Sequence, residues 1–505
     1  MTHAGAHART PVIVGAAQLT QRWESVEQQL DPLRLMLAVA RLAFRDSGTS
    51  AIADTIDAVD VVNTITWSYA DAPGLLVESL GVRPAHTQYT SVGGNTPQYL
   101  VNRACERLES GAIQAALLVG AEAGHSAQRA RKLGVELGWP RFEKACEVDG
   151  DARSGASNLE FAYELMLPSL MYPLIETTLR ARAGRSPSAH AAHLGALCER
   201  LSRVAATHPN AWFPIARDAE EIAIPTSENR YVGYPYTKLM NAIMTVDQAA
   251  AIVLTTEERA DALGIDRALR VYPMGGGDLN DVWHVTERPR LDESPALREA
   301  ARYALDRAGI SIGDVTTFDL YSCFPCAVQI ASEMLGVAVD DPRGLTVTGG
   351  LPYFGGPGNN YSMHAIATMV DRIRCEPDTI SMVTALGWYL TKHSVGIYGS
   401  RPTKNSWSGP GLASAQVAIE ETALPPPLTR YDGPLVVEAF VIRHGRDGEA
   451  RSGVVVGRSD RAERVVAGID AGPAVLAQLE ETELVGSAGR CRHDPASGRN
   501  LLSLA

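Results

Sequence analysis

Hydrophobic and polar positions follow two alternating periods along the first 125 residues. Residues 11–19 (PVIVGAAQL) form a continuous apolar run of strand length, which is typical of a strand buried on both faces. Residues 31–48 then place apolar side chains at helical spacing, with Asp at the start and Gly at the end. A second strand is predicted at residues 56–65, followed by a helix at 96–111 that runs into a third strand at 112–123. This alternation predicts an α/β fold with a parallel sheet covered on both faces.

The pattern changes at about residue 124 and changes back at about residue 234. Between these positions the sequence favours long helices without strong strands, which indicates a helical insertion in the first domain. The α/β pattern resumes at 241–256 and then repeats in kind, beginning with a strand predicted at residues 269–273, although no residue-level repeat links the two halves. We therefore expect one half at residues 1–260, containing the insertion at about 124–234, and a second half at 261–410.

A separate domain is predicted at the end of the chain, over residues 425–505. Three prolines at 425–427, after a weakly periodic stretch from residue 400, indicate a linker. Predicted elements beyond it are strands at 435–443, 452–458 and 465–469, a helix at 473–481, and short strands around 483–490 and 501–504. Three strands, a helix and two strands is the order of a small OB-fold barrel, the alternative being another small α+β module.

Composition and charge narrow the possible partners and the compartment. A length of 505 residues suggests roughly three domains, and a net charge of −12 argues against nucleic acid or an anionic membrane as partner. No apolar run approaches the roughly eighteen residues of a spanning helix, and the first residues lack the pattern of a secretory signal. Seven scattered cysteines fit a reducing compartment, so we expect a cytoplasmic protein.

One pair of cysteines, Cys323 and Cys326, forms a C-x-x-C motif. No second Cys or His pair stands at finger-like spacing, so no metal site is expected. The motif is interpreted as two packed thiols at a helix start, with a redox pair as the alternative.

Several segments in the same order resemble the thiolase superfamily over roughly residues 10–400. They are VIVGAAQLTQR, ERLESGAIQAALLVGAEA and YPYTKLMNAIMTVDQAAAIVLTTEERADALGI. With the additional C-terminal domain, the resemblance is to the thiolase-like protein type 1 group. It implies a thiolase fold, in which two similar halves build five layers, α-β-α-β-α, and a coenzyme A (CoA) thioester as substrate or ligand, with no other cofactor.

The thiolase reaction requires three reactive side chains, and this sequence has substituted all of them. A nucleophilic Cys takes the acyl group, a second Cys moves a proton, and a His helps to form an oxyanion hole. By the resemblance, Gly94 in SVGGNTP, or Gly93 with a one-residue gap, stands at the nucleophile, Gly356 at the His and Ala385 at the second Cys. Acyl transfer by the family mechanism is therefore not supported.

Other groups in or beside the segments that correspond to the thiolase catalytic motifs remain available for chemistry. The resemblance leaves the loop backbone at Gly93, Asn95, Gly355 and Gly387 as oxyanion-binding groups. The candidate catalytic side chains are Tyr321, Tyr353, Cys323 and His393, the last preceded by Lys392. Each has an ordinary structural alternative: a core tyrosine, a buried thiol, or a capping or surface histidine.

Three functions remain open. The first is an acyl-CoA-binding protein, nominally an acyltransferase, without the usual Cys, His and Cys. The second resembles thiolase-fold aldolases: a lyase that cleaves a β-hydroxyacyl-CoA through tyrosines, with the C-terminal domain in the place of their separate OB-fold partner. The third is a non-catalytic scaffold that binds a CoA thioester.

Overall fold

The first sheet belongs to the N-terminal half and has five strands. A computed structural model describes residues 8–504; residues 1–7, part of the stretch expected to lack a secretory signal, lie outside them. The sheet order is β1 (Pro11–Thr20), β7 (Asp247–Thr256), β4 (Ala115–Ala123), β2 (Ala58–Val61) and β3 (His86–Tyr89). The pairs β4–β2 and β2–β3 are parallel, whereas β7 is antiparallel to both of its neighbours. The prediction of a wholly parallel sheet was therefore wrong.

The second sheet repeats this topology in the C-terminal half. Its order is β8 (Tyr272–Asn280), β11 (Lys392–Gly399), β10 (Ser381–Gly387) and β9 (Thr317–Asp319). In both sheets the first strand of the half neighbours the last, which confirms the predicted duplication. Only four residues connect β10 to β11, so these two strands are necessarily antiparallel.

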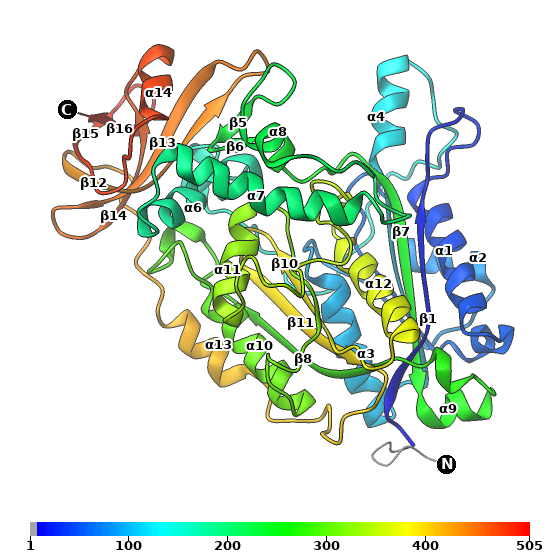
Figure 1. Ribbon diagram of the computed structural model, residues 1–505. Helices are drawn as coiled ribbons and strands as arrows, with labels where there is room; N and C mark the ends of the chain where they lie inside the picture. The colour runs from blue at the N-terminus through cyan, green and yellow to red at the C-terminus, as the bar shows by residue number, and fades with distance from the viewer. Residues whose placement is uncertain (1–7, 505) are drawn as a thin grey trace.

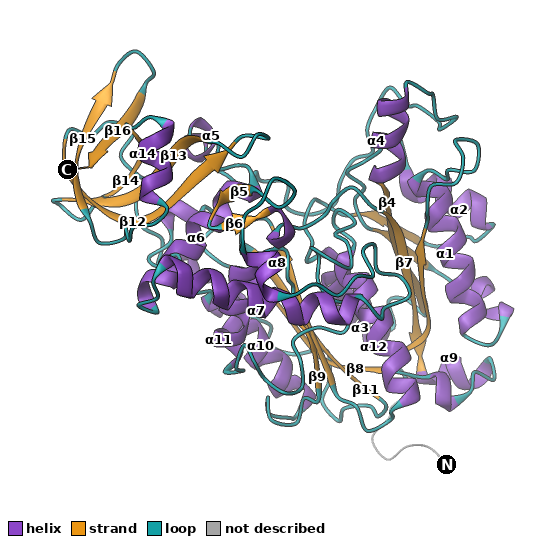
Figure 2. Ribbon diagram, turned by 45° about the horizontal axis from the view of Figure 1, so that its top comes forward, coloured by secondary structure: helices purple, strands orange, loops and turns teal. Residues whose placement is uncertain are grey.

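Helices fill the space between the sheets and cover their outer faces (Figures 1 and 2). The middle layer consists of α3 (Thr96–Ser110) and α12 (Tyr361–Cys375), which contact strands of both sheets. Outside the first sheet lie α1 (Pro32–Asp46), α2 (Ala72–Leu80) and α9 (Glu257–Ala262). Outside the second lie α10 (Pro295–Ala308), α11 (Pro325–Leu335) and α13 (Ala413–Glu420). The five predicted layers are thus present.

Two elements differ from their predictions for identifiable reasons. The strand expected at residues 269–273 is β8, which continues through three glycines that ordinarily disfavour strands. A Cβ at Gly275 or Gly277 would overlap the backbone oxygen of Ala304 or Ala300, so the glycines let α10 lie directly on the sheet. The stretch expected to be linker contains α13, whose weak amphipathicity produces no clear periodic signal in the sequence.

The insertion consists mainly of helices, as predicted. They are α4 (Gly124–Leu133), α5 (Asn158–Ala162), α6 (Pro168–Arg182), α7 (Pro187–Ala205) and α8 (Ala219–Ala223). The hairpin of β5 (Tyr231–Tyr234) and β6 (Tyr236–Thr237) follows.

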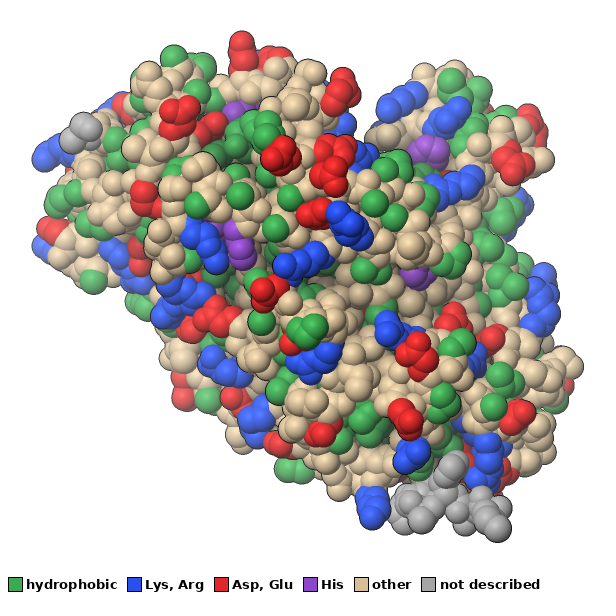
Figure 3. Space-filling model, viewed as in Figure 1, with side chains coloured by type: hydrophobic (Ala, Val, Ile, Leu, Met, Phe, Trp, Pro, Cys, Tyr) green, Lys and Arg blue, Asp and Glu red, His purple; other side chains and the backbone are tan. Residues whose placement is uncertain are grey.

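Short 3-10 helices occur at η1 (Ser50–Thr55), η2 (Lys238–Met240), η3 (Arg267–Leu269) and η4 (Val285–Glu287). On the face in Figure 3, a notch separates the lobe of α4 from the lobe that carries the end of the chain.

The C-terminal domain is a closed barrel of five strands, which confirms the prediction of a small barrel. The strands run in the order β13 (Ala450–Ser459), β14 (Arg464–Ile469), β16 (Arg499–Leu504), β15 (Ala488–Asp494) and β12 (Gly433–His444), and β12 pairs again with β13. Helix α14 (Pro473–Leu479) lies between β14 and β15 in the chain. The hairpin β5–β6 extends the same sheet from β12, so one sheet spans the insertion and the barrel.

A buried arginine fastens the barrel to the body. The Arg180 side chain on α6 is fully buried, pairs with Glu483 at 3.1 Å and donates to the Tyr234 hydroxyl at 2.8 Å. Its guanidinium lies 5.4 Å from the ring centre of Phe440 on β12. A buried cation is tolerated when its hydrogen bonds and charge are matched in this way. No helix within residues 8–504 is long and apolar enough to cross a membrane.

Candidate functional site

The loop before α3 leaves no room for a side chain at the nucleophile's position. A Cβ added to Gly94 would overlap the hydroxyl of Tyr321 and lie 2.6 Å from the carbonyl oxygen of Leu386. The hydroxyl of Tyr321 therefore occupies the space that the thiol of a nucleophilic cysteine would need. Glycine is required at this position by its neighbours from the other half of the molecule.

The loops that the resemblance assigned to catalysis do come together. A Cβ at Gly387 would lie 2.5 Å from Asn95 Oδ1 and 3.1 Å from the Cα of Gly93. The N–H of Gly93 donates to Asn359 Oδ1 at 2.9 Å. The N–H of Gly93 thus has a partner within the fold, and its role as an oxyanion-binding donor stays a prediction. The glycines instead allow two loops from different halves to pack backbone against backbone.

The three remaining positions that the resemblance singled out, Gly355, Gly356 and Ala385, each have neighbours of their own. The N–H of Gly356 donates to the carbonyl oxygen of Ile243 at 2.8 Å, and its Cα faces Leu351. Gly355 has a φ of 115°, and a Cβ there would overlap the side-chain oxygen of Gln248. Ala385 is fully buried on β10. No roles follow from these positions, which stay predictions.

The two candidate tyrosines are core residues. Tyr321 is 6% exposed and packs edge-on against Tyr361 at a centroid distance of 5.3 Å. Tyr353 is 1% exposed and lies beside Cys198. Burial raises the pKa of both phenols well above the ordinary value. A general base needs a pKa closer to neutral, so this environment opposes the role predicted for them.

The cysteines of the C-x-x-C motif are buried free thiols at the start of α11. Burial raises the pKa of Cys323 to about 12, against the opposing hydrogen bond from Tyr172. The Sγ of Cys326 contacts the carbonyl oxygen of Tyr172 at 3.5 Å. Since a thiolate is the reactive form of cysteine, neither thiol is activated in this state.

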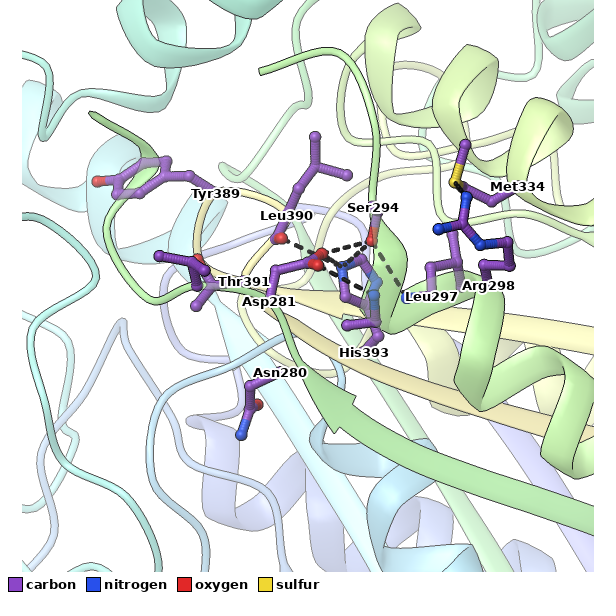
Figure 4. Close-up of polar contacts among 12 residues, drawn as sticks. Asn280, Asp281, Ser294, Leu297, Arg298, Met334, Tyr389, Leu390, Thr391 and His393 are labelled. Atoms are coloured by element: carbon purple, nitrogen blue, oxygen red, sulfur yellow. Dashed lines mark hydrogen bonds and ion pairs between the residues drawn. The ribbon is translucent and has the colours of Figure 1, made fainter. Parts of the chain in front are cut away.

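His393 joins Asp281 and Ser294 in a cluster that resembles a catalytic triad only in composition (Figure 4). One nitrogen, His393 Nε2, lies 3.0 Å from Ser294 Oγ, 3.1 Å from the Leu390 carbonyl oxygen and 3.2 Å from Asp281 Oδ2. An oxygen of Leu390 can only accept, so Nε2 carries the proton and cannot act as base toward Ser294.

The same cluster begins α10. Ser294 Oγ donates to Asp281 Oδ2 at 2.5 Å and accepts from the N–H of Leu297 at 3.2 Å, as a helix N-cap does. Asp281 Oδ1 accepts from Ala296 N at 3.0 Å. Burial opposes ionisation of Asp281, yet the hydrogen bond and charge of His393 hold its pKa below the usual range. His393 therefore lies against the N-cap of α10, where it contacts the capping side chains of Ser294 and Asp281.

A buried carboxyl that sequence reasoning did not single out lies behind the Gly-rich loop. Glu122 is the third residue of GAEA, the end of a segment quoted above, and its oxygens accept from Ile65 N at 2.7 Å and from Thr66 N at 2.9 Å. Burial raises the pKa of Glu122 to about 7. A Cβ at Gly358 would overlap Glu122 Oε1, so the carboxyl supports this loop from beneath.

A cavity of about 470 Å³ opens beside the same loops, at the start of α3. Ser91, Asn95 and Lys392 connect it to the glycine loops. Most of the remaining wall comes from four segments far apart in the sequence, within residues 99–106, 149–151, 276–283 and 411–416. The volume lies within the range of about 300–1,000 Å³ of small-molecule sites.

Comparison with known proteins places the chain in a family. The pattern of the thiolase-like protein type 1 additional C-terminal domain matches residues 415–496. A crystal structure of a monomeric SCP2-thiolase-like protein type 1 from Mycobacterium smegmatis is 30% identical, with a TM-score of 0.85, over 99% of this chain and 100% of that one. The chain belongs to the thiolase-like protein type 1 family.

Other relatives share a smaller part of this thiolase-like protein. The benzoylsuccinyl-CoA thiolase subunit BbsB of Thauera aromatica is 29% identical over 157 residues, 31% of this chain. The match spans 38% of that relative's length. An Ltp2–ChsH2(DUF35) aldolase has the same fold, with a TM-score of 0.62 and 17% identity over 78% of this chain and 98% of that one. The thiolase fold expected from the sequence is confirmed.

The cavity of this thiolase-like protein also brings together residues that no sequence pattern connects. Trp283 follows β8, and Asp151 and Arg153 belong to the insertion, yet the three meet: Arg153 lies 3.8 Å from the Trp283 ring centre and pairs with Asp151 at 2.6 Å. No motif links them. Only Lys392 could have been suspected, because it is a charged residue at the start of a strand that continues into the apolar run VGIYG.

Proposed function

We propose that the protein binds a CoA thioester without forming an acyl-enzyme. The observation that carries this proposal is the fit of Gly94 against Tyr321 and Leu386, which excludes any nucleophilic side chain from the family's position. The loops that surround this position have kept their close glycine contacts, and a cavity of small-molecule size lies against them. Relatives that share part of the sequence are named as thiolases of CoA thioesters, which supports that ligand class.

The remaining reactive groups support binding better than catalysis. A thiol with a pKa of about 12, as at Cys323, is almost entirely protonated at neutral pH. His393 is held as a proton donor to a carboxylate and a carbonyl oxygen. Neither group is available to activate a substrate, which favours the scaffold interpretation over an acyltransferase. The seven free cysteines support a reducing, cytoplasmic location.

Cleavage of a β-hydroxyacyl-CoA is the competing function. It is favoured by one feature, the barrel fixed to the thiolase-like body, since a protein of similar fold is described as an aldolase with a DUF35 partner. It is opposed by the burial of Tyr321 and Tyr353, which raises the pKa of both candidate bases. The two functions differ in what happens to the ligand after binding.

The test incubates the full-length protein with acetyl-CoA, acetoacetyl-CoA and a β-hydroxyacyl-CoA. We expect saturable binding by calorimetry, unchanged thioesters by mass spectrometry, and no added mass on the protein. Coenzyme A without an acyl group serves as the matched ligand control. An acylated residue between Ser91 and Thr96 would contradict the proposal, and release of an aldehyde or ketone from the β-hydroxyacyl-CoA would establish the lyase instead.

A further inference from the structure

Lys392 differs from every other lysine of the chain in its surroundings. The sequence contains five lysines, and Lys132, Lys144, Lys238 and Lys404 are exposed. Lys392 is 6% exposed and lines the cavity beside α3. A buried lysine needs a reason, because long charged side chains are rarely buried without a partner of opposite charge.

The amine of Lys392 has only neutral hydrogen-bond acceptors. Nζ donates to the carbonyl oxygen of Val92 at 2.9 Å, and more distantly to the carbonyl oxygen of Asp151 at 3.4 Å and Ser91 Oγ at 3.5 Å. No carboxylate oxygen among the described residues forms an ion pair with it. The ring of Trp283 lies 5.6 Å from Nζ and forms one side of its surroundings.

The carboxylates of the cavity wall are engaged elsewhere. Asp151 pairs with Arg153, and Asp278 and Glu106 pair with Arg103 at 3.1 Å and 2.8 Å. The remaining charged or titratable groups of the wall are Asp149, which accepts from Tyr89 N, Arg307, which lies 4.0 Å from Glu106, His393 beside the N-cap of α10, and the phenols of Tyr99 and Tyr303. The wall therefore leaves the amine of Lys392 without a fixed counter-ion.

Such an environment favours the neutral amine. Burial lowers the pKa of Lys392, and the charge of Arg153 lowers it further, against the opposing charge of Asp151. A neutral amine can keep its hydrogen bond to Val92 and still present a lone pair to the cavity. Lysines desolvated beside another cation are the ones that add to carbonyl groups in proteins.

We propose that Lys392 is a Schiff-base lysine, whose amine condenses with the aldehyde or ketone group of a small organic molecule bound in this cavity. The amine nitrogen adds to the carbonyl carbon, and both amine hydrogens leave with the carbonyl oxygen as water, which gives an imine. No oxidant or reductant is needed. The cavity offers Trp283 and Leu279 as apolar surface for the carbon skeleton. The imine forms in the same cavity that supports the proposal of CoA binding, but its formation requires no CoA thioester.

Reductive trapping tests the proposal on the full-length protein. Propanal and sodium cyanoborohydride convert an imine into a stable propyl-lysine, and peptide mass spectrometry measures the rate at each of the five lysines. At pH 7 we expect Lys392 to react at least about tenfold faster than the four exposed lysines, because only a neutral amine adds to a carbonyl group. The reaction at Lys392 should also saturate with propanal, as binding in a cavity requires.

Two controls separate the proposal from its alternatives. Lys392→Met should abolish the fast, saturable reaction, and Lys238→Arg, at an exposed position, should leave it unchanged. Because Lys392→Met could unfold the chain, near-ultraviolet circular dichroism checks the variant, and the site-resolved rates in the wild-type protein stand independently of it. A rate at Lys392 no greater than at the surface lysines would overturn the proposal. The proposal would also be overturned if acetate protected Lys392 from the reaction and its amine titrated like that of an exposed lysine. Lys392 would then be an ammonium group that binds anions.

Discussion

Replacing Gly94 with alanine tests whether close packing by its neighbours excludes any side chain from the position of the family's nucleophile. The added methyl group would overlap the Tyr321 hydroxyl and lie 2.6 Å from the backbone oxygen of Leu386. Neither neighbour can give way easily, because Tyr321 is buried against Tyr361 and Leu386 belongs to β10. We expect the free energy of unfolding to fall by about 1–3 kcal/mol, the usual cost of overpacking a core.

A second substitution shows where the cost arises. Tyr321→Leu removes the hydroxyl and the ring carbon that would lie 2.7 Å from the added methyl group, at the expense of a small cavity. The double variant Gly94→Ala/Tyr321→Leu should therefore lose less stability than the sum of the two single variants. Gly94→Cys should be destabilised like Gly94→Ala and should not acquire an acyl group from acetoacetyl-CoA.

The assay is denaturant unfolding followed by circular dichroism and fluorescence. Gly138→Ala is the matched control, since position 138 is exposed with no neighbour within 4 Å of an added Cβ, and it should change stability by no more than about 0.5 kcal/mol. A Gly94→Ala protein as stable as the wild type, or strictly additive effects in the double variant, would refute the packing argument.

Three further predictions concern charged groups in the core. Burial raises the pKa of Glu122 to about 7 in the folded protein, so the folded state binds this proton more tightly than the unfolded state does. The free energy of unfolding should therefore fall by about 3 kcal/mol as pH rises from 5 to 8. Glu122→Gln should flatten that part of the profile of unfolding free energy against pH. The hydrogen bond and charge of Glu480 raise the pKa of His444 against desolvation, so this pair stabilises the fold most below the ordinary histidine pKa and loses its effect at higher pH; Glu480→Gln should lower the thermal midpoint more at pH 6 than at pH 9. Glu483→Gln, which leaves the charge of Arg180 buried without a counter-ion, should destabilise the protein more than Arg180→Met, which leaves the partly exposed Glu483 to water; equal losses in urea unfolding would contradict this reasoning.

The layered fold could be predicted because its evidence lies in local periodicity. Apolar runs such as residues 11–19 and helical spacing such as residues 31–48 are read directly from the chain, and their order repeats in both halves. β8 was misjudged because its glycines serve contacts with α10 and α3 that no local pattern reveals. The direction of each strand likewise depends on the path by which the chain returns to the sheet, and the local periodicity of the sequence does not determine that path.

The candidate site was predictable in position but not in environment. The segments around Gly94, Gly387 and Tyr321 do contact one another, because similarity to a family implies a similar arrangement of these segments in space. The burial that raises the pKa of Tyr321, and the single-nitrogen contacts of His393, depend on neighbours from other elements. Lys392 gained its surroundings from Asp151 in the insertion and Trp283 after β8, which have no shared motif.

Strands β5 and β12 pair across the domain boundary, so the prolines at 425–427 separate two segments of the sequence but not two independently folding units. Ile442 and Arg443 of the barrel pair with Tyr234 and Gly233 of the insertion, and Arg180 closes the joint from beneath. Cutting the chain near residue 425 would bare both the edge of β5 and the apolar side of α6. The barrel and the body should consequently melt in a single cooperative transition, and neither should be recovered as a well-behaved fragment on its own.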